Sequence, residues 1–95
     1  MAEFILFSHD DGGDTGDWAP YLEKLRTLGV FRGGSAMGGG VCARKAGPLP
    51  ALTPHLAGYL RIDADDLAHA RVLLEGHPTY EAGGTVEIRE LPRTS

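Results

Sequence analysis

Histidines and carboxylates are the groups with which this chain could do chemistry. His9 is followed directly by Asp10, and His77 lies near the other end of the sequence. A histidine near a carboxylate can act as a base close to neutral pH. We therefore take His9, Asp10 and His77 as candidate acid–base groups. For His77 the alternative is structural, because a cationic imidazole is favoured at the C-terminus of a helix.

The sequence predicts no metal or cofactor site. A calcium-binding loop that began at Asp10 would have Thr15 where glycine is needed and Tyr21 where glutamate is needed. The four histidines lack the close spacing of zinc ligands. The glycine-rich residues 33–40 lack the Lys-Ser/Thr ending of a phosphate-binding loop. We expect neither a metal nor a cofactor.

Composition indicates one small domain over residues 1–95. The net charge is −4 and the nine basic residues are scattered, which argues against nucleic acid as a partner. The first residues lack both the basic region of a signal peptide and the length of a membrane span, so we expect a cytoplasmic protein without membrane contact. The single cysteine, Cys42, excludes an internal disulfide and is predicted to be a core residue.

Hydrophobic periodicity predicts the elements of the first half. The run Phe4-Ile5-Leu6-Phe7 predicts a central strand over residues 3–8, buried on both faces. Apolar residues then recur every three or four positions over residues 18–28, which predicts a helix that Asp14 or Thr15 caps and Gly29 ends. Two short strands are predicted near residues 30–34 and 41–45, joined as a hairpin by the glycine-rich segment.

The second half predicts a strand over residues 56–62, a helix and a last strand. The helix has its apolar stripe at residues 67–74, is capped by Asp63 and ends at Gly76 and Pro78. The sequence TVEIREL, residues 85–91, alternates with Val86 and Ile88 inward. The predicted order is strand, helix, three strands, helix, strand.

This order predicts an α+β sandwich of the ferredoxin-like type. Its sheet is mostly antiparallel and carries both helices on one face. The other face then needs a cover, and a two-fold partner is the simplest one. We therefore predict a homodimer that packs sheet on sheet over apolar residues such as Leu60, Ile62, Val86 and Ile88.

The end of the chain resembles a known family. GHPTYEAGGTVEIREL, residues 76–91, is similar to the helix end, His-Pro turn, Gly-Gly turn and last strand of the YCII-related family, including its branch named for a DGPF motif. AGPLPALTPHLAGYL, residues 46–60, then lines up with that branch's DGPFAETKE loop and the strand after it. The likeness extends from FILFSHD through Trp18 to Leu91 and Pro92. It implies a ferredoxin-like domain in a dimeric α+β barrel, with an enzymatic role in which some relatives use a His/Asp pair.

The DGPF motif is degenerate here, because it reads AGPL. Ala46 replaces the aspartate and Leu49 the phenylalanine, whereas Gly47 and Pro48 are kept. The later acidic and lysine positions of the family are Ala51, Thr53 and Pro54 in this chain. Without these carboxylates the loop cannot perform acid–base catalysis. The chemistry of that branch therefore does not carry over to this loop. We interpret residues 46–60 as a structural loop that lines or covers an apolar space.

Two functions remain open at the level of sequence. The first is a small-molecule enzyme of the YCII kind, which performs proton transfer or elimination on a compact, partly apolar substrate. His9, Asp10 and His77 would supply the acid–base groups, and the ligand-binding residues would be Trp18 and Tyr59 as walls and Arg44 as an anion contact. The second is a non-catalytic binding or dimerisation module with a degenerate site. Whether His9 and His77 share a pocket discriminates between the two.

Overall fold

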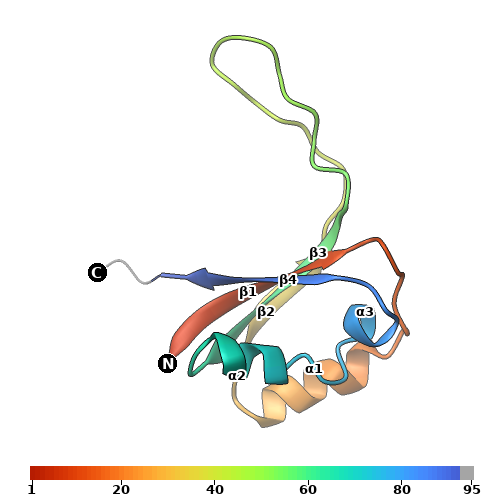
Figure 1. Ribbon diagram of the computed structural model, residues 1–95, viewed down its shortest axis with the longest axis vertical. Helices are drawn as coiled ribbons and strands as arrows, with labels where there is room; N and C mark the ends of the chain where they lie inside the picture. The colour runs from red at the N-terminus through yellow and green to blue at the C-terminus, as the bar shows by residue number, and fades with distance from the viewer. Residues whose placement is uncertain (93–95) are drawn as a thin grey trace.

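The computed structural model describes residues 1–92 and has an α+β architecture. Its elements are, in chain order, β1 (Ala2–His9), α1 (Trp18–Thr27), β2 (Phe31–Ala36), β3 (Leu56–Ala64), α2 (Leu67–Val72), α3 (Pro78–Glu81) and β4 (Val86–Leu91). The strands form one antiparallel sheet in the order β2-β3-β1-β4. The helices lie on one face of the sheet, as Figure 1 shows. This arrangement is compatible with the predicted ferredoxin-like fold.

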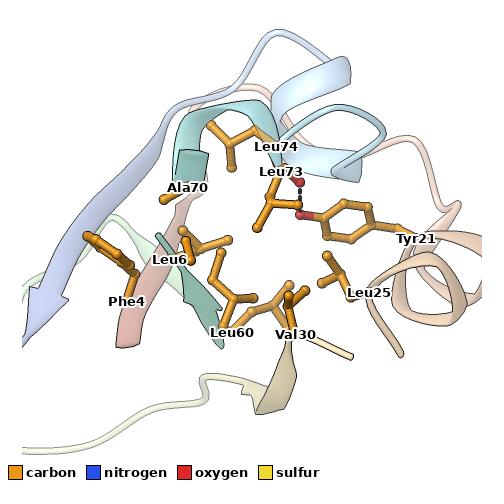
Figure 2. Packing of buried hydrophobic residues seen from close by; sticks show 11 residues of the cluster. Phe4, Leu6, Tyr21, Leu25, Val30, Leu60, Ala70, Leu73 and Leu74 are labelled. Atoms are coloured by element: carbon orange, nitrogen blue, oxygen red, sulfur yellow. Dashed lines mark hydrogen bonds between the residues drawn. The ribbon is translucent and has the colours of Figure 1, made fainter. Parts of the chain in front are cut away.

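The core lies between that face of the sheet and the helices. Along β1 the side chains alternate, so Phe4 and Leu6 are buried and stand opposite Ile62 and Leu60 of β3. From α1, Leu25 and Tyr21 complete the layer. The Tyr21 hydroxyl donates a hydrogen bond of 2.7 Å to the carbonyl of Leu73, which links α1 to the end of α2 (Figure 2). Burial raises the pKa of this phenol.

Helix α1 begins without the predicted caps. Asp17 is its N-cap residue but makes no side-chain hydrogen bond there. Asp14 instead accepts a hydrogen bond from the N–H of Gly16 at 2.7 Å, and Thr15 accepts one from the N–H of Asp17 at 3.3 Å. Both residues therefore stabilise the turn before the helix. Gly29 follows the helix with φ of +73°, which confirms its predicted role at the C-terminus.

Helix α2 is capped by Asp66 rather than by the predicted Asp63. The Asp66 side chain accepts a hydrogen bond of 2.8 Å from the N–H of His69. Asp63 is buried in β3, and its carboxylate accepts a hydrogen bond of 2.7 Å from the Arg32 guanidinium Nε. The sequence does not reveal this role of Asp63, because its partner Arg32 lies far away along the chain.

Residues 37–55 leave the sheet as a long projection, which we call the arm (Figure 1). The strand predicted over residues 41–45 is wrong, since none of residues 37–55 forms a strand. Gly38, Gly39 and Gly40 make this segment costly to order and supply no side chains to pack. The arm raises the radius of gyration to 14.7 Å, compared with about 12 Å for a compact domain of this length.

The arm is not the predicted cover of an apolar space. Leu49 is 62% exposed and Val41 87% exposed. Cys42 lies on the arm and not in the core, and its thiol donates a long hydrogen bond of 3.6 Å to the Ala51 carbonyl. The arm retains local order through Arg44, which donates a hydrogen bond of 2.8 Å to the Pro48 carbonyl. The prediction for residues 46–60 therefore holds only for the part that enters β3.

The face of the sheet opposite the helices carries different residues from those predicted. Leu60 and Ile62 are buried in the core, and Val86 and Ile88 pack against it. The residues that alternate with them along the strands lie on the other side of the sheet, which we call the open face. This face carries the half-buried Ile5, Phe7 and Tyr59 and the charged Glu3, Arg61, Glu87 and Arg89. None of the helices within residues 1–92 has the length and apolar character that a bilayer crossing requires.

Candidate functional site

A cavity of about 510 Å³ lies between α1 and the end of the sheet at which β1 and β2 end and β3 begins. Its lining comes from all of these elements, from the loop after β1 and from α3. The lining residues are Ser8, His9, Asp10, Gly13, Asp14, Trp18, Leu22, Phe31, Gly34, Ser35, Ala36, Ala57, Gly58, Tyr59, Leu60 and Thr79. This volume falls within the range of small-molecule sites, about 300–1,000 Å³.

The body of the cavity is apolar. Trp18 and Leu22 of α1 and Phe31 of β2 pack against the core and form its walls. Gly34 keeps β2 close to β3, because a Cβ atom there would lie 2.4 Å from the Tyr59 carbonyl oxygen. Polar groups are few within the walls, and a mainly apolar lining with a few polar groups is typical of binding sites.

The loop after β1 is held in place at the rim of the cavity. The Asp11 carboxylate accepts hydrogen bonds from the Thr85 N–H at 2.8 Å and the Thr85 hydroxyl at 2.6 Å. The hydrogen bond from the hydroxyl holds the pKa of Asp11 below its ordinary value. The backbones of Gly12 and Gly84 also approach closely, since a Cβ atom on Gly12 would lie 2.6 Å from the Gly84 nitrogen. These contacts fix the segment that carries Asp10 and Asp14.

His9 contributes to the lining, but its ring stands on the open face. Its Nε2 lies 3.1 Å from Glu87 Oε1, and its ring packs edge-on against His55 with centroids 4.7 Å apart. Glu87 is opposite Phe7, which places all of these side chains on the side away from the helices. Hydrogen bonds from Arg89 and then from His9 hold the pKa of Glu87 below its ordinary value.

His77 lies in the helix layer, fully buried between two aromatic rings of α1. Its ring centroid is 5.0 Å from that of Trp18 and 5.1 Å from that of Tyr21. Nδ1 accepts a hydrogen bond of 3.2 Å from the N–H of Thr79, so the neutral ring carries its proton on Nε2. Nε2 has no hydrogen-bond partner among the described residues. Burial lowers the pKa of His77 to about 4.

His77 therefore has a role that differs from the cationic one considered from sequence. It is the N-cap residue of α3, a helix that the sequence analysis missed. Pro78 was interpreted only as the end of the preceding helix, although proline is also common at the first position of a helix. The imidazole is neutral and accepts a hydrogen bond from the first turn of α3. The sequence instead predicts a cationic ring at the C-terminus of α2.

The structure brings together only part of the predicted site. Trp18 and Asp10 lie at the cavity, and Tyr59 lines it from β3 while its ring alternates to the open face. His9 and His77 stand on opposite sides of the sheet. Arg44 lies on the arm, where it bonds Pro48, and does not line the cavity.

Several lining residues were missed by sequence reasoning. Ser8 and Thr79 are buried polar residues at the cavity, and Ala36 lies where the arm leaves β2. Ser8 carries no clear signal in the sequence, because residues 4–7 are apolar throughout, and only the structure shows that it continues the buried side of Phe4 and Leu6. Thr79 carries none, since α3 itself was not predicted.

Within residues 1–92 no group of three His, Cys, Asp or Glu residues could hold a metal ion. Comparisons with protein-family models, with curated proteins and with solved structures found no match for this chain. The likeness to the YCII-related family stays a prediction from sequence.

Proposed function

We propose that this chain is a binding domain whose ligand, a small and partly apolar molecule, occupies the cavity beside α1. The observation that carries the proposal is the cavity itself, which has about 510 Å³ of space and is walled by Trp18, Leu22 and Phe31. A ligand that fills such a space gains binding free energy, because its apolar surface and that of the cavity are removed from water. Asp10 at the rim and Ser8 and Thr79 in the wall supply polar contacts that can orient it.

Binding without acid–base catalysis fits the geometry better than the enzymatic alternative. An acid–base pair must lie within hydrogen-bond reach of the same substrate. The His9 ring bonds Glu87 on the open face, whereas the His77 ring is enclosed between Trp18 and Tyr21 on the other side of the sheet. We therefore propose the non-catalytic role, with Trp18 as the main wall of the ligand site.

Filling the cavity tests this function. We expect Ala36→Phe to abolish ligand binding, because Ala36 faces Gly58 on the cavity side of the sheet and its new ring would occupy the ligand's space. A thermal-shift screen of small apolar compounds identifies the ligands, since one present at 100 times its Kd raises the melting temperature by about 10 °C. Ala46→Phe, the same change on the arm, should leave these shifts unaltered. If Ala36→Phe retains the shifts seen with the parent chain, the ligand site lies elsewhere.

The second part of the proposal is a two-fold homodimer that packs through the open face. Ile5, Phe7 and Tyr59 form an apolar strip there. The charges beside them are already paired, with Arg61 donating to Glu3 at 2.8 Å and Arg89 to Glu87 at 2.9 Å. Paired charges cost less to bury than isolated ones, which makes this face suitable for a sheet-on-sheet interface.

We expect Phe7→Lys to convert the dimer to a monomer. Each chain would then bury an unpaired lysine in an interface that should cover more than about 1,000 Å². Sedimentation equilibrium at micromolar concentration measures the mass, and the monomer is 10.1 kDa. Val72→Lys, on an exposed position at the end of α2, is the control and should remain dimeric. A monomeric parent chain would remove the dimer from the proposal.

A further inference from the structure

We infer that the cavity accepts neutral and positively charged ligands and discriminates against anions. The inference rests on the proposed binding function and names the chemical class of its ligand: a compact aromatic or aliphatic body that carries an amine or an uncharged polar group. It comes from the distribution of charge around the cavity.

The charged side chains at the cavity are carboxylates. Asp10 and Asp14 line it, and both are exposed at its rim. Among residues 1–92, those that line the cavity include no Lys or Arg. The asymmetry starts in the sequence, because the first Lys or Arg of the chain is Lys24, after four aspartates in residues 10–17. An anionic ligand would meet like charge at the rim and find no Lys or Arg in the lining, where the one imidazole, that of His9, is paired with Glu87.

The arginines that a carboxylate ligand might recruit are engaged elsewhere. Arg44, the anion contact predicted from sequence, bonds the Pro48 carbonyl on the arm. Arg32 bonds the buried Asp63. Arg26 stacks on the Phe31 ring with 5.2 Å between its guanidinium carbon and the ring centroid, yet it does not line the cavity. The local potential at the mouth is therefore set by Asp10 and Asp14.

The walls of the cavity suit a cation as well as its rim does. Trp18 lines it, and among aromatic rings that of tryptophan attracts cations most effectively. A ligand amine at the mouth would combine this attraction with the charge of Asp10 and Asp14, while its apolar body lies against Leu22 and Leu60. A neutral ligand keeps the apolar part of this interaction.

Matched probes that share one body and differ in charge test the inference. Phenethylamine, phenethyl alcohol and phenylacetate carry a cation, a neutral hydroxyl and an anion, and hexylamine, hexanol and hexanoate repeat the series on an aliphatic body. Trp18 is the only tryptophan and lines the cavity, so its fluorescence reports occupancy directly. We expect each amine to bind about tenfold or more tightly than its carboxylate at low ionic strength near neutral pH, with the alcohol between them.

The double variant Asp10→Asn, Asp14→Asn should reduce the preference for the amine over the carboxylate several-fold. Asparagine can keep the hydrogen bond from the Gly16 N–H that Asp14 accepts. Glu90→Gln, on β4 opposite Phe4 at the far end of β1, makes the same kind of change away from the cavity and should leave the preference unaltered. Carboxylates that bind as tightly as the amines, or a preference that survives in the double variant, would overturn the inference while leaving the binding function standing. If no probe of either series binds, the proposed binding function fails and this inference fails with it.

Discussion

Replacing Leu25 with alanine is expected to lower the free energy of unfolding by about 2–5 kcal/mol, which is the usual cost of removing a large core side chain. Leu25 is 0% exposed and packs between α1 and the sheet. The same substitution at Leu49, which is 62% exposed on the arm, should change the free energy of unfolding by less than about 0.5 kcal/mol. Denaturant melts of the two variants beside the parent chain measure both values.

The pair of leucines also tests the position of the arm in solution. Equal losses at Leu25 and Leu49 would mean that the arm is packed against protein, either in the same chain or in a second copy. The expected contrast would instead support the arm as a projecting segment. Both variants remove the same side-chain atoms, and the small difference in helix propensity between Leu and Ala is well below about 2 kcal/mol, so the contrast between them reports burial.

Acidification from pH 7 to pH 4 is expected to lower the free energy of unfolding by about 3 kcal/mol through His77 alone. Burial lowers the pKa of His77 from its ordinary value of 6.5 to about 4 in the folded chain. Above pH 6.5 the ring is neutral in both states, so the stability is complete there. As the pH falls from 6.5 towards 4, the unfolded chain binds a proton that the folded chain refuses, and stability is lost over that window.

The variant His77→Asn isolates this contribution. As an N-cap residue, asparagine can still accept a hydrogen bond from the N–H of Thr79, but its side chain does not titrate. We expect lower stability at neutral pH, because the contacts with Trp18 and Tyr21 are lost, and a flat profile between pH 6.5 and 5. His69→Asn, at a partly exposed histidine, should keep the slope of the parent chain. A parent chain as stable at pH 4.5 as at pH 7 would contradict the assignment. The lowered pKa values of Asp11 and Glu87 place their effects below pH 4.5.

The elements that depend on a strong local pattern could be predicted from the sequence. The helix around Tyr21 and Leu25 and the strands that contain Leu6, Leu60 and Ile88 lie close to their expected bounds. Each has an apolar periodicity that the core then satisfies. The strand expected near Val41 failed because a strand needs a neighbour to pair with, and β-propensity depends on that context.

The candidate site could be predicted only in part, because its geometry depends on which face of a strand each residue occupies. Phe4-Ile5-Leu6-Phe7 is apolar throughout, so no alternation shows on which side His9 falls. The register of β1 with β4 decides it, by placing His9 beside Glu87. The sequence predicts His77 at the end of the preceding helix, but that helix, α2, ends at Val72 and not at Gly76 and Pro78. His77 is instead the N-cap residue of α3, and Pro78 is the first residue of that helix.

The arm is a segment at which residues can be removed from or inserted into this protein. It connects β2 and β3, neighbouring antiparallel strands whose ends a tight turn of about two to five residues could join. Because the entropy of closing a loop grows only with the logarithm of its length, the present connection costs about 1 kcal/mol more than a five-residue turn would. Residues 38–54 can therefore be trimmed, or exchanged for a foreign peptide or an inserted domain, while Met37 and His55 keep their backbone hydrogen bonds with Ala57 and Asp10 and the sheet keeps its register. The projection is a natural grafting point on a scaffold whose remaining connections are short.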